Sequence, residues 1–210
     1  KNIDFIFHAA AMKHVPIAEY NPMEAIKTNI LGSQNLIFAC IKNKVRNVMA
    51  LSTDKAVNPI NLYGSTKLAA DKLFIAANNL SGKNGTKFSV VRYGNVLGSR
   101  GSVIPLFKKL SENKLNKLPI THPEMSRFFI AIEEAISFVL EMFNEMKGGE
   151  IFVPKIPSVE ITELANAIAP LNNQKITGIR PGEKISEVLI SEEESMYTYE
   201  THNHYVVLPI

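Results

Sequence analysis

One stretch, residues 46–74, most constrains how this chain can fold. It reads RNVMALSTDKAVNPINLYGSTKLAADKLF, and its first seven residues are uncharged after Arg46, which is typical of a short buried strand. A polar corner, STDK, follows, and residues 62–74 are then patterned as a helix that carries Tyr63 and Lys67. In open α/β sheets, ligands bind outside the carboxyl ends of the strands. We therefore expect chemistry at this corner.

Tyr63 and Lys67 are four residues apart, so they lie on one face of the predicted helix. The ammonium of Lys67 would favour the phenolate and lower the tyrosine pKa from about 10 toward working pH. Asp54 and Lys55 add a carboxylate and a second amine at the strand end. Each feature alone is common on solvated helix faces or in turns. Their order is specific: a strand, TDK, a short loop, and then a helix with YxxxK.

This order of motifs resembles the short-chain dehydrogenase/reductases, in their extended branch that modifies sugar nucleotides. The version STDKAVNPINLYGSTK is similar to the soluble UDP-N-acetylglucosamine 4,6-dehydratases that invert C5 and start pseudaminic acid synthesis. The resemblance continues through FHAAAMKHVPIAEYNP, VVRYGNVLGSRGSV, EIFVPKIPS and GIRPGEK, and so covers nearly the whole chain. It implies a cytoplasmic, homo-oligomeric enzyme that uses NADP or NAD to remove water from UDP-N-acetylglucosamine, for surface polysaccharide or flagellin glycan synthesis.

The resemblance also assigns roles to residues. It makes Lys55 the base that takes the C5 proton and Asp54 the acid that assists loss of the C6 hydroxyl, while Tyr63 takes the C4 hydroxyl proton. Thr53 and Lys67 complete the catalytic set. The cofactor is expected against Ala9, Ala10, Lys13, Leu51, Ser52, Tyr63, Lys67 and Val96, and the substrate against Lys13, Asn95, Thr121 and Arg180.

Three polar residues have competing interpretations. Arg180 in the GIRPGEK loop is either a solvated loop arginine or, as the resemblance implies, the residue that binds a diphosphate with two hydrogen bonds. His14 is expected to be a loop histidine with a structural hydrogen bond. Asn29 either supports the backbone of the active site, as in the extended branch, or is a surface asparagine. No metal is expected, since His202 and His204 have no cysteine or third histidine nearby.

Strands alternate with helices in the first half of the chain, which predicts a parallel sheet with right-handed crossovers. We expect a Rossmann-like, doubly wound α/β fold in which residues 1–100 are the C-terminal portion of an NAD(P)-binding domain. Residues 101–210 are expected to form mainly a smaller substrate-binding part, with a helix at about 132–146 and a strand at about 150–153 returning to the main sheet. The family's glycine-rich phosphate loop does not occur in the sequence, so we expect a fragment of a longer protein.

The composition limits which classes of ligand and which environment suit this chain. The net charge of +3 comes without a basic run or a tryptophan, which argues against nucleic acid and suits an anionic nucleotide diphosphate. The single cysteine, Cys40, excludes a disulfide within the chain and fits a reducing cytoplasm. The longest uncharged run, residues 28–41, is shorter than the ~20 residues of a membrane span. We therefore expect no membrane association.

Two other functions stay open. A UDP-sugar 4-epimerase would need Tyr63, Lys67 and the cofactor, but no acid–base pair for elimination. The Asp54-Lys55 pair favours the dehydratase, although some relatives with TDK are described as epimerases. Membrane-anchored relatives that retain C5 typically have Met at the position of Tyr63, so this chain groups with the soluble branch. A non-catalytic dinucleotide-binding protein would commonly have lost Tyr63 or Lys67, and both are present.

Overall fold

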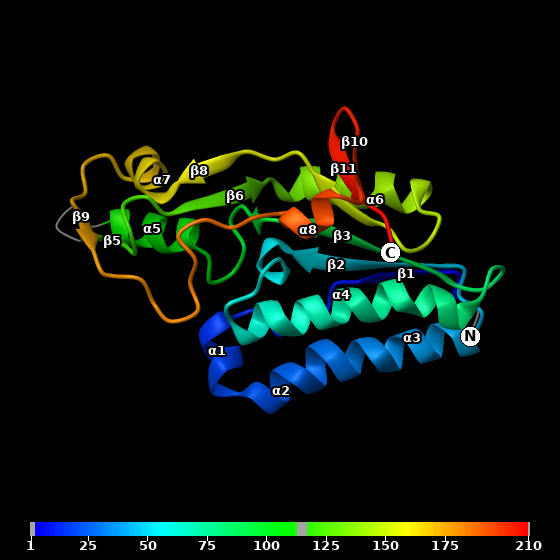
Figure 1. The fold of residues 1–210 in the computed structure, drawn as a ribbon. Coiled ribbons are helices and arrows are strands. Elements are labelled where there is room, and N and C mark those ends of the chain that lie inside the picture. The colour runs from blue at the N-terminus through cyan, green and yellow to red at the C-terminus, as the bar shows by residue number, and fades with distance from the viewer. Residues whose placement is uncertain (1–2, 113–116, 210) are drawn as a thin grey trace.

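A computed structural model describes residues 3–112 and 117–209. Its main sheet has six strands in the order β1-β2-β3-β7-β11-β10 (Figure 1). The parallel strands are β1 (Phe5–His8), β2 (Asn47–Thr53), β3 (Lys87–Tyr93) and β7 (Ile151–Pro154), and β11 (His204–Val207) and β10 (Thr198–Glu200) add an antiparallel hairpin. The α/β fold with a mainly parallel sheet is confirmed.

Helices cover both faces of this sheet (Figure 1). α4 (Leu62–Ser81) packs on β2 and β3 from one side, and α6 (Ile132–Glu145) packs on them from the other. Because alternate strand residues point to opposite faces, Phe88 joins Phe74 of α4 in one apolar cluster, while Val91 joins Phe138 of α6 in another. Burial of each such side chain contributes about 1.5–3 kcal/mol.

The sequence from Asn21-Pro22 to about Lys42 is patterned as one helix, with Asn21 as its expected N-cap, but the structure divides this helix. α2 (Pro22–Ile26) leads into a π-helical turn, η1 (Lys27–Leu31), and then into α3 (Gly32–Lys42). A further helix, α1 (Val15–Tyr20), precedes them and was not predicted. Asn21 does not cap α2 with its side chain, because its Nδ2 donates instead to the Ile17 carbonyl at the end of α1, at 3.1 Å.

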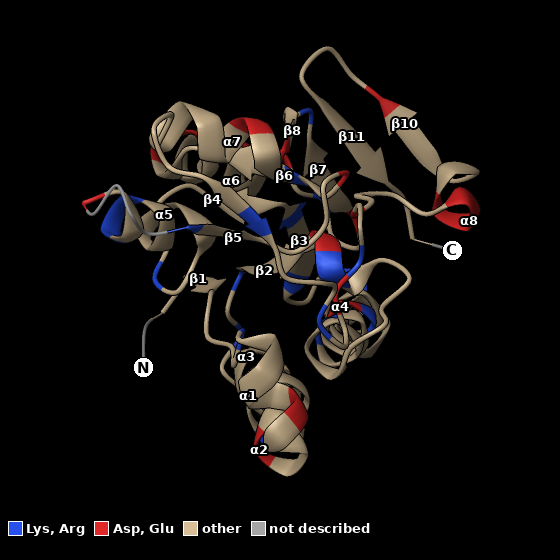
Figure 2. Ribbon diagram, turned by 90° about the vertical axis from the view of Figure 1, so that its left-hand side faces the viewer, with Lys and Arg blue, Asp and Glu red and all other residues tan. Residues whose placement is uncertain are grey.

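A second group of elements has its own apolar cluster. It comprises β4 (Asn95–Val96), α5 (Val103–Ser111), β5 (Leu118–Ile120), β6 (Ser126–Ile130), β8 (Ser158–Glu160), α7 (Ile161–Ile168) and β9 (Gln174–Ile176). Phe107, Leu118, Ile120 and Phe129 are buried at its centre. Between β6 and β8 the chain returns to the main sheet through α6 and β7. Figure 2 shows the β10–β11 hairpin projecting on one side, next to the short, acidic α8 (Glu192–Ser195).

A buried ion-pair network joins this C-terminal region to the sheet. Arg92 of β3 is only 1% exposed and donates to both carboxylate oxygens of Glu194, at 2.8 and 2.9 Å. Its guanidinium also lies 3.7 Å from Asp71 of α4, which accepts a hydrogen bond of 2.6 Å from Ser52. Burial raises the pKa of the Asp71 carboxyl, and Arg92 opposes that rise. The network therefore connects α8, β3, α4 and the end of β2.

Replacing Arg92 with Leu should lower the free energy of unfolding by about 3–5 kcal/mol, because removing one partner leaves buried carboxylates without their counter-charge. Urea unfolding of the wild type and the variant measures this loss. The matched control is Lys27→Met, which breaks an ion pair with Glu24 in which both side chains are 57% exposed. That change should cost at most about 1 kcal/mol. Equal losses in the two variants would contradict a structural role for the buried network.

Candidate active site

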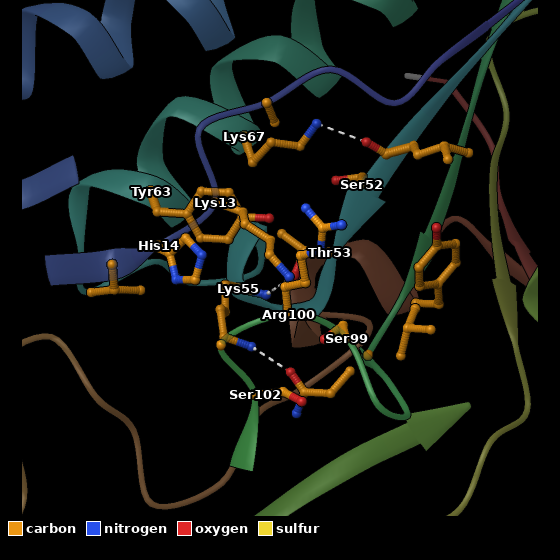
Figure 3. A pocket seen from close by; sticks show the side chains of 18 of the residues that line it. Lys13, His14, Ser52, Thr53, Lys55, Tyr63, Lys67, Ser99, Arg100 and Ser102 are labelled. Atoms are coloured by element: carbon orange, nitrogen blue, oxygen red, sulfur yellow. Dashed lines mark hydrogen bonds between the residues drawn. The ribbon is translucent and has the colours of Figure 1, made fainter. Parts of the chain in front are cut away.

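A cavity of about 520 Å³ lies at the carboxyl ends of β1, β2 and β3. Many of the residues singled out from the sequence line it: Ala9, Lys13, Leu51, Ser52, Thr53, Lys55, Tyr63, Lys67, Asn95, Val96 and Arg180. They come from four separate parts of the chain, and Figure 3 shows Tyr63, Lys67 and Lys55 around the same space. Ala10, Asp54 and Thr121 are not part of the lining.

Tyr63 occupies the first turn of α4, directly against the strand-end corner. Asn61 caps this helix by accepting a hydrogen bond of 2.7 Å from the Gly64 backbone. A Cβ on Gly64 would lie 2.1 Å from the Lys55 carbonyl oxygen, so only glycine allows the helix to approach the corner this closely. The position of Tyr63 beside Lys55 therefore depends on a backbone contact as well as on helix periodicity.

Burial dominates the ionisation of Tyr63. It raises the pKa of the phenol well above its usual value, and a hydrogen bond with Thr53 only partly offsets this rise. Negative charge on Asp54 and Asp71 raises the pKa further. The lowering expected from Lys67 is not seen in this structure. Four-residue spacing puts the two side chains on one helix face, but it does not fix the direction in which the ammonium points.

The Lys67 ammonium is directed to the end of β2, where it donates a 2.7 Å hydrogen bond to the Leu51 carbonyl (Figure 3). The side chain is almost fully buried, and burial lowers the pKa of Lys67 while Asp71 opposes the change. The lysine is thus anchored to the backbone at the cavity wall, with its charge next to the strand end.

Thr53, Asp54 and Lys55 form a compact polar unit. Asp54 begins a 3-10 turn, η2 (Asp54–Ala56), and the Thr53 hydroxyl accepts from the Lys55 backbone at 3.3 Å. Lys55 Nζ donates to Asp54 Oδ1 at 3.0 Å and to Asn95 Oδ1 at 3.3 Å. The Asp54 side chain is fully buried, and its Oδ2 makes no hydrogen bond with the residues that the structure describes. Lys55 therefore faces the cavity, with Asp54 behind it.

Asn29 is a buried support of the cavity wall, which excludes the surface interpretation. It lies in the π-helical turn and is 2% exposed. Its side chain accepts from the Met12 backbone N–H at 2.8 Å and donates to the Met12 carbonyl at 3.0 Å and to Thr66 of α4 at 2.9 Å. These bonds fix the segment before Lys13 against α4. Such π-helical turns occur frequently at functional sites.

The loop around Arg180 closes another side of the cavity. Arg180 is 70% exposed, and its guanidinium pairs with Glu183. Pro181 and Glu183 also line the cavity. Thr121 follows β5, which pairs with β9, and it is not among the residues that line the cavity. Thr121 as a substrate contact is a prediction without support from this geometry.

Several lining residues were not singled out from the sequence, among them four that lie within the motif VVRYGNVLGSRGSV: Tyr93, Ser99, Arg100 and Ser102. Gly101 has a φ of +73°, and a Cβ there would lie 2.5 Å from the ring of His14. His14 itself lines the cavity, where it meets this loop. The sequence signal that could have indicated Arg100 is its place in the glycine-rich segment GSRGS. Arg100 adds a second guanidinium to that of Arg180.

The chain is similar in sequence to known proteins that act on UDP-sugars. A family model described as a polysaccharide biosynthesis protein matches residues 1–209. This chain belongs to that family. It is 60% identical over 209 residues to the UDP-N-acetylglucosamine 4,6-dehydratase (inverting) of Campylobacter jejuni subsp. jejuni serotype O:2, covering 100% of this chain and 63% of that protein. It is also 46% identical to the UDP-glucose 4-epimerase of Rickettsia bellii strain OSU 85-389, over 98% of this chain and 61% of the relative.

Solved structures of other proteins have the same fold as this chain. The structure of Pen from Bacillus thuringiensis has a TM-score of 0.93 and 41% identity, covering 100% of this chain and 67% of that one. DesIV, a dTDP-glucose 4,6-dehydratase from Streptomyces venezuelae solved with NAD, has a TM-score of 0.81 at 19% identity, covering 92% and 66% of the two chains. The chain thus spans about two thirds of the proteins it matches.

Among the described residues, none of the helices is both long and apolar enough to cross a membrane.

Proposed function

We propose that this family member carries the catalytic centre of a UDP-N-acetylglucosamine 4,6-dehydratase that inverts C5. The observation that carries the proposal is that two candidate bases, the Tyr63 phenol and the Lys55 amine, line one cavity, and that Asp54 is hydrogen-bonded to Lys55 directly behind it. Oxidation at C4 needs one base, and removal of the C5 proton needs a second. The identity of 60% to a relative with this activity supports the same assignment.

The cavity has donors and apolar walls that suit the nicotinamide end of a dinucleotide. Lys67 and Tyr63 present an ammonium and a phenol at one end, and Leu51 and Val96 provide apolar surface. Ala9 adds a small side chain where a flat ring can approach the strand end. These residues would hold NADP or NAD, which supplies a hydride acceptor for C4 and a hydride donor for C6. The choice between NADP and NAD stays a prediction.

Tyr63 is the residue that would take the proton of the C4 hydroxyl. Its burial disfavours the phenolate that this step needs, and the neighbouring Thr53 hydroxyl opposes this effect by lowering the pKa of the phenol. Lys67 would bind the ribose of the cofactor with the donors that the Leu51 carbonyl leaves free. The Tyr63 hydroxyl and the Lys67 ammonium therefore have separate tasks, one on the sugar and one on the cofactor.

Lys55 is the base proposed for the C5 proton. It faces the cavity, and its amine is held by Asp54 on one side and by Asn95 on the other. Asp54 is the acid proposed for loss of the C6 hydroxyl. Its Oδ2 is the carboxyl oxygen without a hydrogen bond among the described residues, and so it is the atom that could carry the proton. Because Asp54 lies behind Lys55, this step requires Lys55 to move aside or to relay the proton.

Arg180 and Arg100 give the cavity a cationic rim suited to a diphosphate. Replacing Arg180 with Ala should weaken UDP binding about tenfold to hundredfold, the effect of losing one charge-assisted hydrogen bond. Titration calorimetry with UDP measures this change, and cofactor affinity should stay constant. The control is Arg46→Ala, since Arg46 is an exposed residue that pairs with Asp4 at the other end of β2. An unchanged dissociation constant for UDP in Arg180→Ala would remove Arg180 from the site.

A UDP-sugar 4-epimerase is the second candidate, favoured by the 46% identity to a relative with a related name. Incubation of the protein with UDP-N-acetylglucosamine in heavy water, followed by NMR of the products, separates the two. A 4-keto-6-deoxy sugar of L-arabino configuration with deuterium at C5 is expected. A C4 epimer that keeps its C6 hydroxyl would establish the epimerase, and no conversion would favour a non-catalytic dinucleotide-binding protein. Pseudaminic acid synthesis, homo-oligomer formation and the cytoplasmic location stay predictions.

A further inference from the structure

Glu187 is a buried carboxylate that none of the steps above uses. Only 3% of its side chain is exposed. Its Oε1 lies 4.0 Å from Lys55 Nζ, and its Oε2 lies 3.3 Å from Lys184 Nζ. Oε2 makes no hydrogen bond with other residues in the described ranges, despite this short distance. Glu187 thus stands between the amine proposed for the elimination and a second lysine from the Arg180 loop.

The segment that carries Glu187 is fixed to the active-site corner at two further points. Lys184 Nζ donates a 2.6 Å hydrogen bond to the Val57 carbonyl, which follows η2. Asn61 Nδ2 donates a 2.8 Å hydrogen bond to the Gly182 carbonyl. Gly182 has a φ of +80°, and a Cβ there would lie 3.0 Å from the Asn61 Cβ. The Arg180 loop and the loop between Lys55 and Tyr63 are therefore joined, although they are far apart in the sequence.

The charges in this contact alternate in sign from Asp54 through Lys55 and Glu187 to Lys184. Buried ion pairs are weak contributors to stability, since the loss of hydration offsets the attraction. The arrangement does have a directional effect, because a carboxylate on each side of the Lys55 amine restricts where that amine can lie. Asn95 supplies a third restraint at 3.3 Å.

We propose that Glu187 is a positioning residue for Lys55. Through Glu187, binding of the diphosphate by the Arg180 loop fixes the position of the amine that removes the C5 proton. The inference rests on the proposed function. Arg180 and Glu187 belong to one segment, so a substrate that holds Arg180 also holds Glu187 beside Lys55. Elimination then proceeds only on a sugar whose diphosphate is bound.

The test is Glu187→Gln, which keeps the shape of the side chain and removes its charge. Release of the 4-keto-6-deoxy sugar and deuterium entry at C5 should both fall about tenfold to hundredfold, the usual effect of a misplaced catalytic group. Reduction of bound cofactor by the substrate, read as nicotinamide absorbance, and KM should each stay within about twofold. Lys184→Met should lower elimination similarly and raise KM, because Lys184 also fixes the loop. The control Glu193→Gln alters an exposed carboxylate on α8 and should change neither step.

The outcomes separate the two proposals. A wild-type protein that forms no 4-keto-6-deoxy sugar overturns the proposed function. If the wild type does form it, Glu187→Gln with wild-type elimination overturns the positioning role alone. A Glu187→Gln variant that does not fold, or that loses cofactor reduction and elimination to the same extent, assigns Glu187 a structural role and also overturns the inference.

Discussion

Tyr63→Phe is expected to abolish turnover, with a loss of about 10²–10⁴-fold in the rate of C4 oxidation. Without the phenol oxygen, no group at this position can take the C4 hydroxyl proton, and the ketone that acidifies C5 cannot form. The fold should survive, because the Tyr63 ring packs in a cluster with Ala18 and Ala25 that a phenylalanine ring also fills. Nicotinamide absorbance with substrate present should show no reduction, and NMR should show no product.

The matched control for this substitution is Tyr20→Phe, which removes a hydroxyl from a tyrosine that is 88% exposed. It should keep full activity. If a Tyr63→Phe variant still reduces cofactor at the wild-type rate, another group at the cavity must be the base. Thr53 would then be the first candidate, since it hydrogen-bonds to Tyr63 and also lines the cavity.

Lys55→Ala should separate the two chemical stages. Oxidation at C4 depends on Tyr63, so the variant should still reduce bound cofactor when substrate is added. Removal of the C5 proton depends on Lys55, and loss of a positioned base typically costs about 10²–10⁴-fold. Release of 4-keto-6-deoxy sugar should therefore fall by this factor, while reduced cofactor accumulates. Absorbance and product NMR on the same sample measure the two stages together.

Lys83→Ala is the control for this prediction, because Lys83 is an exposed residue in the loop after α4. It should convert substrate at the wild-type rate. The elimination mechanism is wrong if Lys55→Ala also keeps that rate, or if the wild-type product retains its original C5 hydrogen. A product that is only the C4 epimer would instead support the epimerase, in which Lys55 has no proton to remove from C5.

Local sequence patterns were sufficient to predict most elements of the fold. Residues 87–93 are patterned as a buried strand and residues 161–168 as a helix, and the structure has β3 and α7 at these positions. The corner after β2 and the YxxxK helix were also predicted, and the cavity lies there, since the carboxyl ends of parallel strands meet at one edge. The antiparallel β10–β11 hairpin was not predicted, because its short segments lack a distinctive period.

By itself, then, the sequence determined the α/β alternation, the position of the acid–base corner and most of the residues around it, since these depend on periodicity and on short motifs. Tertiary structure alone decided the rest. It placed Asp54 behind Lys55, directed Lys67 to a backbone carbonyl, and set the pKa of Tyr63 by burial. It also brought Arg100 to the cavity and Glu187 to Lys55. These features depend on contacts between segments far apart in the chain, which no local pattern records.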